Sequence, residues 1–126
     1  MTSGAAALII PGMSSYGISK HSCMKIVEFL AAEHPELSVF AVNPGLVKES
    51  DPVPAFKPFA QDAVALVGGF MLWLASGKAD GLKGSTVNVN WDVDVLEKNA
   101  EKIKEGALLK PSYLGYKFMT GAPLLE

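Results

Sequence analysis

Residues 14–45 read SSYGISKHSCMKIVEFLAAEHPELSVFAVNPG, and the hydrophobic pattern changes within this stretch from helical to extended. Apolar side chains recur at spacings of three and four between residues 23 and 31, which predicts a helix with one apolar face from Ser14 to His34. Pro35 ends that helix, because proline cannot continue it. The apolar, β-branched run at 37–42 then predicts a strand covered on both faces.

The residues that follow continue the alternation of helices and strands. The pattern predicts an irregular loop rich in proline, a deeply buried apolar helix, a second short strand, a charged surface helix and a loosely structured tail, at 46–58, 60–75, 85–90, 93–104 and 105–126. Strands that alternate with helices are typical of a parallel α/β sheet with right-handed crossovers. The fold class is therefore α/β, although two strands are few for such a sheet.

The composition describes one apolar domain without a basic surface. A length of 126 residues fits a single domain, and 49% hydrophobic residues with a net charge of -2 exclude a wholly disordered chain. All eleven basic residues are lysines, and the pI is about 5.7. Nucleic-acid binding is therefore not expected, because it normally needs a basic excess and uses arginine for bidentate contacts.

Neither a targeting signal nor a metal site is visible. Residues 1–4 have no basic n-region, and the most apolar run, 63–75, is shorter than the ~20 residues that span a bilayer. Cys23 is the single cysteine, and no cluster of metal ligands accompanies His21 or His34. We expect a soluble cytoplasmic protein with no disulfide, no metal and no membrane partner.

Tyr16 and Lys20 form the first chemically suggestive pair. They are four residues apart at the start of the predicted helix, so both side chains project from one face, one turn apart. A lysine ammonium beside a phenol favours the phenolate, which lets tyrosine act as an acid or base near neutral pH. Ser3 lies thirteen residues before Tyr16, and its hydroxyl could hydrogen-bond a substrate carbonyl.

These residues, taken in order, resemble the short-chain dehydrogenase/reductase family. The resemblance comprises Ser3, the motif Tyr16-Gly17-Ile18-Ser19-Lys20, and a strand at 37–42 that ends in Asn43-Pro44-Gly45-Leu46-Val47. The apolar helix and the last strand also fall where the family has its last helix and strand, so the resemblance covers nearly the whole chain. The segment 90–93, followed by a charged helix, looks most like fungal members.

The resemblance implies a function, a cofactor and a partial fold. Residues 1–126 would be the catalytic, C-terminal half of a Rossmann-type NAD(P)-binding domain, with two strands and three helices, and the N-terminal nucleotide-binding strands would be missing. The reaction would be hydride transfer between NAD or NADP and a small alcohol or carbonyl substrate. Tyr16 would be the acid or base, Ser3 would orient the carbonyl, and Lys20 would bind the nicotinamide ribose. Residues contacting the cofactor would be Tyr16, Lys20, Pro44, Gly45 and Val47.

The loop at 46–58 would lie on the substrate side of this site. Within and just after it, Phe56 and Phe59 could line a substrate pocket or anchor the loop. Glu49 stands where many family members have a threonine that contacts the cofactor, which places an acidic side chain near the pyrophosphate.

Other interpretations remain open. No Gly-x-x-x-Gly-x-Gly turn opens a helix, and residues 81–85 only superficially resemble a phosphate loop. The chain could therefore be a catalytically inactive truncated fragment, or an interaction protein that depends on a partner. A homo-oligomer could form through the helix that carries Tyr16 and Lys20. A serine hydrolase is disfavoured, because residues 12–17 are one residue too long for Gly-x-Ser-x-Gly.

Overall fold

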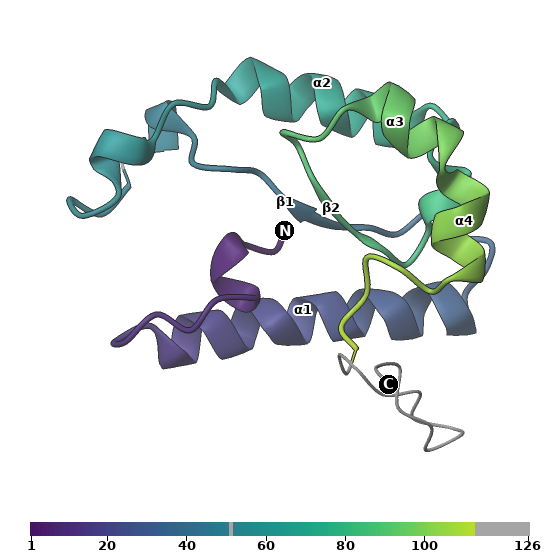
Figure 1. The fold of residues 1–126 in the computed structure, drawn as a ribbon, viewed down its shortest axis with the longest axis horizontal. Helices are drawn as coiled ribbons and strands as arrows, with labels where there is room; N and C mark the ends of the chain where they lie inside the picture. Colours follow the sequence, from purple (N-terminus) through teal and green to yellow (C-terminus); the bar gives the residue numbers. More distant parts are fainter. Residues whose placement is uncertain (51, 113–126) are drawn as a thin grey trace, which may run out of the picture.

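The computed structural model describes residues 1–50 and 52–112, which form an α/β structure around a two-stranded parallel sheet (Figure 1). Strand β1 (Ala41–Asn43) pairs with β2 (Thr86–Asn88), and Val42 lies opposite Val87. The predicted parallel pairing is confirmed. Both strands are shorter than the predicted 37–42 and 85–90, although single hydrogen bonds such as Gly84 N to Val39 O continue the pairing beyond the ladder.

Helix α1 (Ser14–Glu33) forms almost as predicted and lies on one side of the sheet, opposite α2 (Val64–Ala75) and α3 (Val93–Lys98) (Figure 1). None of its twenty residues is fully buried. The predicted apolar face is half-buried at Cys23, Val27 and neighbouring positions, but Ile26 is 56% exposed. Including Ile26 in that face was wrong, because a step of 100° per residue turns it away from the side that Val27 occupies.

Helix α2 (Val64–Ala75) begins four residues later than predicted. The start is displaced because η3 (Lys57–Phe59) forms a 3-10 turn and Asp62 forms a parallel bridge with Val47. The expectation that this helix is deeply buried was also wrong. Within it only Phe70 and Leu74, four residues apart, are buried, while Leu72 is 75% exposed. A sheet of two strands covers one stripe of the helix and leaves the other sides exposed.

The predicted charged helix at 93–104 is divided in two. Helix α3 (Val93–Lys98) and helix α4 (Ala100–Glu105) are separated at Asn99, so the described chain contains four α-helices where three were predicted. Asp92 caps α3 by accepting hydrogen bonds from the amides of residues 94 and 95. Three further 3-10 turns, which the sequence did not predict, are η1 (Gly4–Ala6), η2 (Lys48–Ser50) and η4 (Asp80–Leu82).

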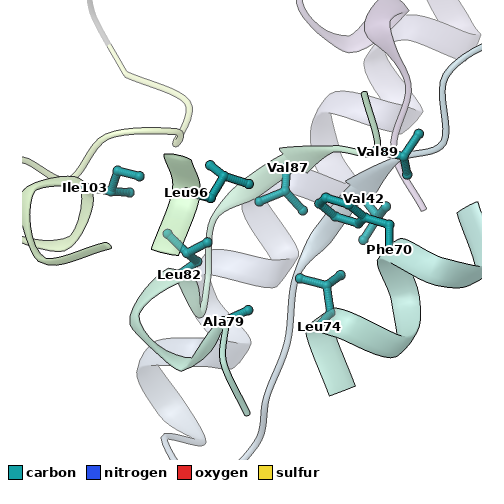
Figure 2. Close-up of a cluster of buried hydrophobic side chains, with 9 residues drawn as sticks. All are labelled: Val42, Phe70, Leu74, Ala79, Leu82, Val87, Val89, Leu96 and Ile103. Atoms are coloured by element: carbon teal, nitrogen blue, oxygen red, sulfur yellow. The ribbon is translucent and has the colours of Figure 1, made fainter. Parts of the chain in front are cut away.

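The hydrophobic core lies on the side of the sheet opposite α1. Figure 2 shows side chains from both strands, from α2 to α4 and from the turn around η4 directed toward one another. The cluster comprises Val42, Phe70, Leu74, Ala79, Leu82, Val87, Val89, Leu96 and Ile103. Since no buried residue of this cluster belongs to α1, other contacts must hold that helix against the sheet.

The sequence also predicted a loosely structured tail at 105–126 and no membrane-spanning helix. The tail predicted at 105–126 begins within α4, and its Leu109 carbonyl accepts a hydrogen bond from Thr86 N at 2.8 Å. The remainder of that tail, 113–126, lies outside the described residues. In residues 1–50 and 52–112, no helix is both long and apolar enough to cross a bilayer.

Candidate functional site

The N-terminal segment is fixed between the sheet and α1 by Thr2. This side chain is only 3% exposed. Its amide donates to Val42 O at 2.8 Å, and its hydroxyl donates to the Lys20 carbonyl at 3.0 Å. Thr2 therefore connects the edge of β1 to the helix that carries the predicted catalytic pair. Sequence reasoning missed Thr2, because no pattern distinguishes one hydroxyl residue in a segment of small residues.

Ser3 follows directly and lies next to the end of β1. Its Oγ accepts a hydrogen bond from Ala5 N at 3.3 Å, so the side chain caps the 3-10 turn η1. The hydroxyl hydrogen is not used in that contact, since the oxygen acts there as the acceptor. Ser3 can therefore still donate a hydrogen bond to a bound molecule.

Tyr16 and Lys20 are brought together by the first turns of α1. The Lys20 ammonium lies 5.5 Å from the centroid of the Tyr16 ring. Gly17 lets η1 approach the helix closely, because a Cβ at this position would lie 2.9 Å from the Ala5 carbonyl oxygen. The absence of a side chain at Gly17 thus allows the Ser3 segment to lie against the turn that carries Tyr16.

The segment after β1 is held in shape by Asp62. The Asp62 carboxylate accepts a hydrogen bond from Leu46 N at 2.7 Å. The backbone of Asp62 also donates to Leu46 O at 3.1 Å and accepts from Lys48 N at 3.0 Å. Gly45 has a φ of +72°, which glycine adopts most readily, and its amide donates to Asn43 Oδ1 at 3.2 Å. These contacts define the path of the chain from Pro44 to Val47.

Glu49 is engaged at the start of α2. Its Oε2 accepts a hydrogen bond from Val64 N at 3.3 Å, and its Oε1 lies 4.0 Å from the Lys48 ammonium. A carboxylate at a helix N-terminus is stabilised by the partial positive charge of the first amides. Glu49 thus supplies a cap that Ala63, the residue before the helix, cannot supply.

A cavity of about 820 Å³ lies between these segments. Of the residues predicted to act in catalysis or cofactor binding, five line it: Ser3, Tyr16, Pro44, Gly45 and Val47. Lys20 is not one of the lining residues in the described chain, although its ammonium lies beside the Tyr16 ring. Phe56 and Phe59 also line the cavity.

The lining residues that were not identified from the sequence as site residues include three polar ones from the sheet end and its flanking segment: Asn43, Asp62 and Asn90. Asn90 follows β2, and its Nδ2 lies 3.4 Å from Asp62 Oδ2. Asp62 and Asn90 come from distant parts of the chain, so only the tertiary structure brings them to the cavity. A polar residue near the carboxyl end of a parallel strand is the one signal that could have found Asn43 and Asn90.

The cavity combines hydroxyl groups with apolar walls. The hydroxyls of Ser3 and Tyr16 are both hydrogen-bond donors that can face the oxygen of a bound carbonyl or alcohol. Across the described parts of the chain, no three His, Cys, Asp or Glu side chains gather in a way that could hold a metal ion.

Comparison with known proteins gives relatives over most of this chain. No family model matches it, and no solved structure matches it significantly. A "Short chain dehydrogenase/reductase" of Claviceps purpurea is 33% identical over 109 residues, which are 82% of this chain and 37% of that protein. "Short chain dehydrogenase pigC" of Monascus ruber is 30% identical over 122 residues, which are 90% of this chain and 40% of that protein.

A third relative, "Short chain dehydrogenase tazN" of Aspergillus terreus, is 29% identical over 104 residues, or 76% of this chain and 23% of that protein. The chain therefore spans between 23% and 40% of the length of these curated relatives. The organisms are fungi, as the segment 90–93 led us to expect. On these matches, the chain belongs to the short-chain dehydrogenase/reductase family.

Proposed function

We propose that this chain provides the acid–base and substrate side of an NAD(P)-dependent oxidoreductase that interconverts an alcohol and a ketone. One observation carries the proposal: Ser3, Tyr16 and the Pro44–Val47 segment border a single cavity, with the Lys20 ammonium beside the Tyr16 ring. Membership of an oxidoreductase family supports it. The arrangement has the donor groups that this reaction needs.

The residues present fit one end of a nicotinamide dinucleotide. Lys20 has three N–H donors for the hydroxyls of a ribose, one helical turn from Tyr16. Pro44, Gly45 and Val47 border the same cavity as Tyr16, where a nicotinamide ring would need backbone contacts. When bound, this cofactor supplies or accepts the hydride.

The adenosine end of the cofactor has no counterpart in the described residues. Residues 81–85 lead from η4 into β2 and open no helix, so they cannot form the glycine-rich turn that holds a pyrophosphate. In this proposal the 126 residues correspond to the C-terminal part of a Rossmann-type sheet. The adenosine end would then be bound by strands that are not part of these 126 residues.

The chain's own residues would move and stabilise the proton. In the direction of reduction, the Tyr16 hydroxyl donates its proton to the substrate oxygen as the carbonyl carbon accepts hydride. Lys20 stabilises the phenolate that remains, because an ammonium beside a phenolate is a favourable charge pair. The Ser3 hydroxyl donates a hydrogen bond to the same oxygen, where negative charge develops in the transition state. Oxidation of the alcohol reverses each of these transfers.

Substitution of Tyr16 tests this proposal. Tyr16→Phe removes the hydroxyl and keeps the ring, so ketone reduction with NADH or NADPH should fall by about 10²- to 10⁴-fold. Binding of the reduced cofactor, measured by its fluorescence, should change little. Ser3→Ala should also reduce turnover, while its control Ser15→Ala, an exposed serine of α1, should not. Full turnover by Tyr16→Phe would show that Tyr16 is not the acid.

A second function, that of an interaction protein, is favoured by the outer face of α1. Ile18, Ile26 and Phe29 are each more than half exposed and lie on one side of this helix, away from the sheet. Such an apolar stripe fits a protein partner, including a second copy of the chain. Sedimentation of the wild type against Phe29→Glu, with Lys25→Glu as the charge control on the same helix, tests self-association. An oligomer without any NAD(P)H binding would favour this second function.

A further inference from the structure

The walls of the cavity beside Tyr16 are mainly apolar. The apolar side chains come from the segment before α1 and from the loop between β1 and α2: Leu8, Ile10, Met13, Val53, Phe56 and Phe59. Leu8, Val53 and Phe59 are each more than half exposed, so they lie at the mouth of the cavity. Thr2, Ser3 and Asn43 are buried or half-buried and lie deeper. The most exposed apolar side chains therefore lie at the mouth, three hydrogen-bonding residues lie deeper, and Tyr16, Ser50 and Asn90 are exposed polar lining residues.

The charge of the lining is the second observation. Among the described lining residues, the one ionisable carboxylate is that of Asp62, and none is a lysine. The Lys48 ammonium is directed to Glu49 and is not part of the lining. The Lys20 ammonium lies beside the Tyr16 ring, but it is not part of the lining and the proposed function assigns it to the cofactor ribose. A carboxylate or phosphate group on a substrate would therefore lose its hydration here without a cationic partner among the lining residues, and it would approach the Asp62 carboxylate. Anionic ligands are therefore disfavoured.

The size of the cavity bounds the ligand. About 820 Å³ lies in the upper part of the range of roughly 300–1,000 Å³ that holds drug-sized molecules. Resting on the proposed function, in which a nicotinamide ring shares this space, we infer that the substrate is a neutral, apolar alcohol or ketone of about fused-ring size. Its oxygen meets Ser3 and Tyr16, and its hydrocarbon part lies against Phe56 and Phe59.

A neutral naphthyl ketone with environment-sensitive emission is a suitable probe, compared with the same ketone bearing a carboxylate. The neutral ketone should bind saturably with a blue shift, and the carboxylate analogue should bind at least about tenfold more weakly. Phe59→Ser should weaken binding of the neutral ketone about fivefold, because it removes apolar contact area. Phe29→Ser is the matched control: both rings are exposed, at 66% and 58%, but Phe29 does not line the cavity.

Asp62→Asn tests the effect of the Asp62 charge on binding, because asparagine is uncharged and has nearly the same size and shape. Asparagine retains an oxygen that can accept from Leu46 N, so binding of the neutral ketone should persist while the disadvantage of the carboxylate analogue decreases. Far-UV circular dichroism of each variant checks that the fold is retained. Equal binding of the two probes by the wild type, or unchanged binding by Phe59→Ser, would overturn the inference.

The ligand class and the proposed reaction can fail separately. Selective binding of the neutral ketone, with bound NADH or NADPH but without any hydride transfer, would support the ligand class and contradict the reaction. Reduction of anionic ketones in preference to neutral ones, if it is abolished by Tyr16→Phe, would support the reaction and contradict the ligand class. Both measurements use the same chain and the same variants.

Discussion

Gly45 and Asp62 form a coupled pair that determines the shape of the segment after β1. Gly45 has a φ of +72°, and a Cβ on it would collide with the Asp62 carboxylate, approaching Cγ within 2.9 Å. Gly45→Ala therefore has two costs: about 1.5 kcal/mol for the left-handed backbone, and about 1 kcal/mol for displacing the carboxylate from Leu46 N. We expect the variant to lose about 2.5 kcal/mol of unfolding free energy.

A double-mutant cycle isolates the contact between the two residues. Asp62→Ala alone should lose about 1 kcal/mol, because it removes the 2.7 Å hydrogen bond from Leu46 N. In the double variant there is no Asp62 carboxylate for the added Cβ to displace, so the loss of the hydrogen bond from Leu46 N is counted only once. Its destabilisation should therefore be smaller than the sum of the single effects by about 1 kcal/mol.

Urea unfolding followed by circular dichroism measures each free energy, provided that the transition is two-state. Gly68→Ala is the matched control. Gly68 lies in α2, and a Cβ added there would meet no other part of the chain within 4 Å. The Gly68→Ala variant should therefore be more stable than the wild type by about 0.5–1 kcal/mol. Additive effects of Gly45→Ala and Asp62→Ala would refute the proposed contact. A loss below about 0.5 kcal/mol for Gly45→Ala would refute the backbone conformation as well.

Two further predictions concern the ties around the cavity. Thr2→Val keeps the shape of the buried side chain but removes the hydroxyl that donates to the Lys20 carbonyl, so stability in urea should fall by about 1 kcal/mol. Thr2→Ser, which keeps the hydroxyl, should lose less, and equal losses would argue against the hydrogen bond. Glu49→Gln weakens the charge at the N-terminus of α2 and should cost about 0.5 kcal/mol at low ionic strength. That cost should shrink in high salt, and a cost independent of salt would contradict the electrostatic explanation.

The parts of the fold that the sequence predicted are those that depend on local spacing. The i,i+4 spacing of Tyr16 and Lys20 places both on one face of any helix, so the 5.5 Å approach follows from the helix alone. The extent of α1 and the parallel pairing of two strands likewise follow from periodicity and from the order of elements. Pro44-Gly45 marks the end of β1 because neither residue favours a continued strand.

The parts that could not be predicted depend on contacts between residues that are far apart in the sequence. Asp62 is sixteen residues from Leu46, and nothing in the intervening sequence indicates that its carboxylate accepts the Leu46 amide. The pairing of Asp62 with the segment after β1 also delays the start of α2 to Val64. The overestimate of burial in α2 has a related cause: hydropathy states how apolar a helix is, whereas the width of the sheet determines how much of it is covered.

The helix that carries Tyr16 and Lys20 has no fully buried residue, so its position depends on contacts other than the hydrophobic core. At its N-terminal half, Thr2 bonds to the Lys20 carbonyl, and His21 Nδ1 lies 3.0 Å from Ala6 O. Near its C-terminal end, Gly84 is the close contact: a Cβ there would lie 2.9 Å from Ala31 Cβ. Because these contacts lie outside the hydrophobic core, a variant can weaken one of them and leave the core intact. Such a variant would move Tyr16 relative to Pro44 and Gly45 and alter binding in the cavity more than global stability.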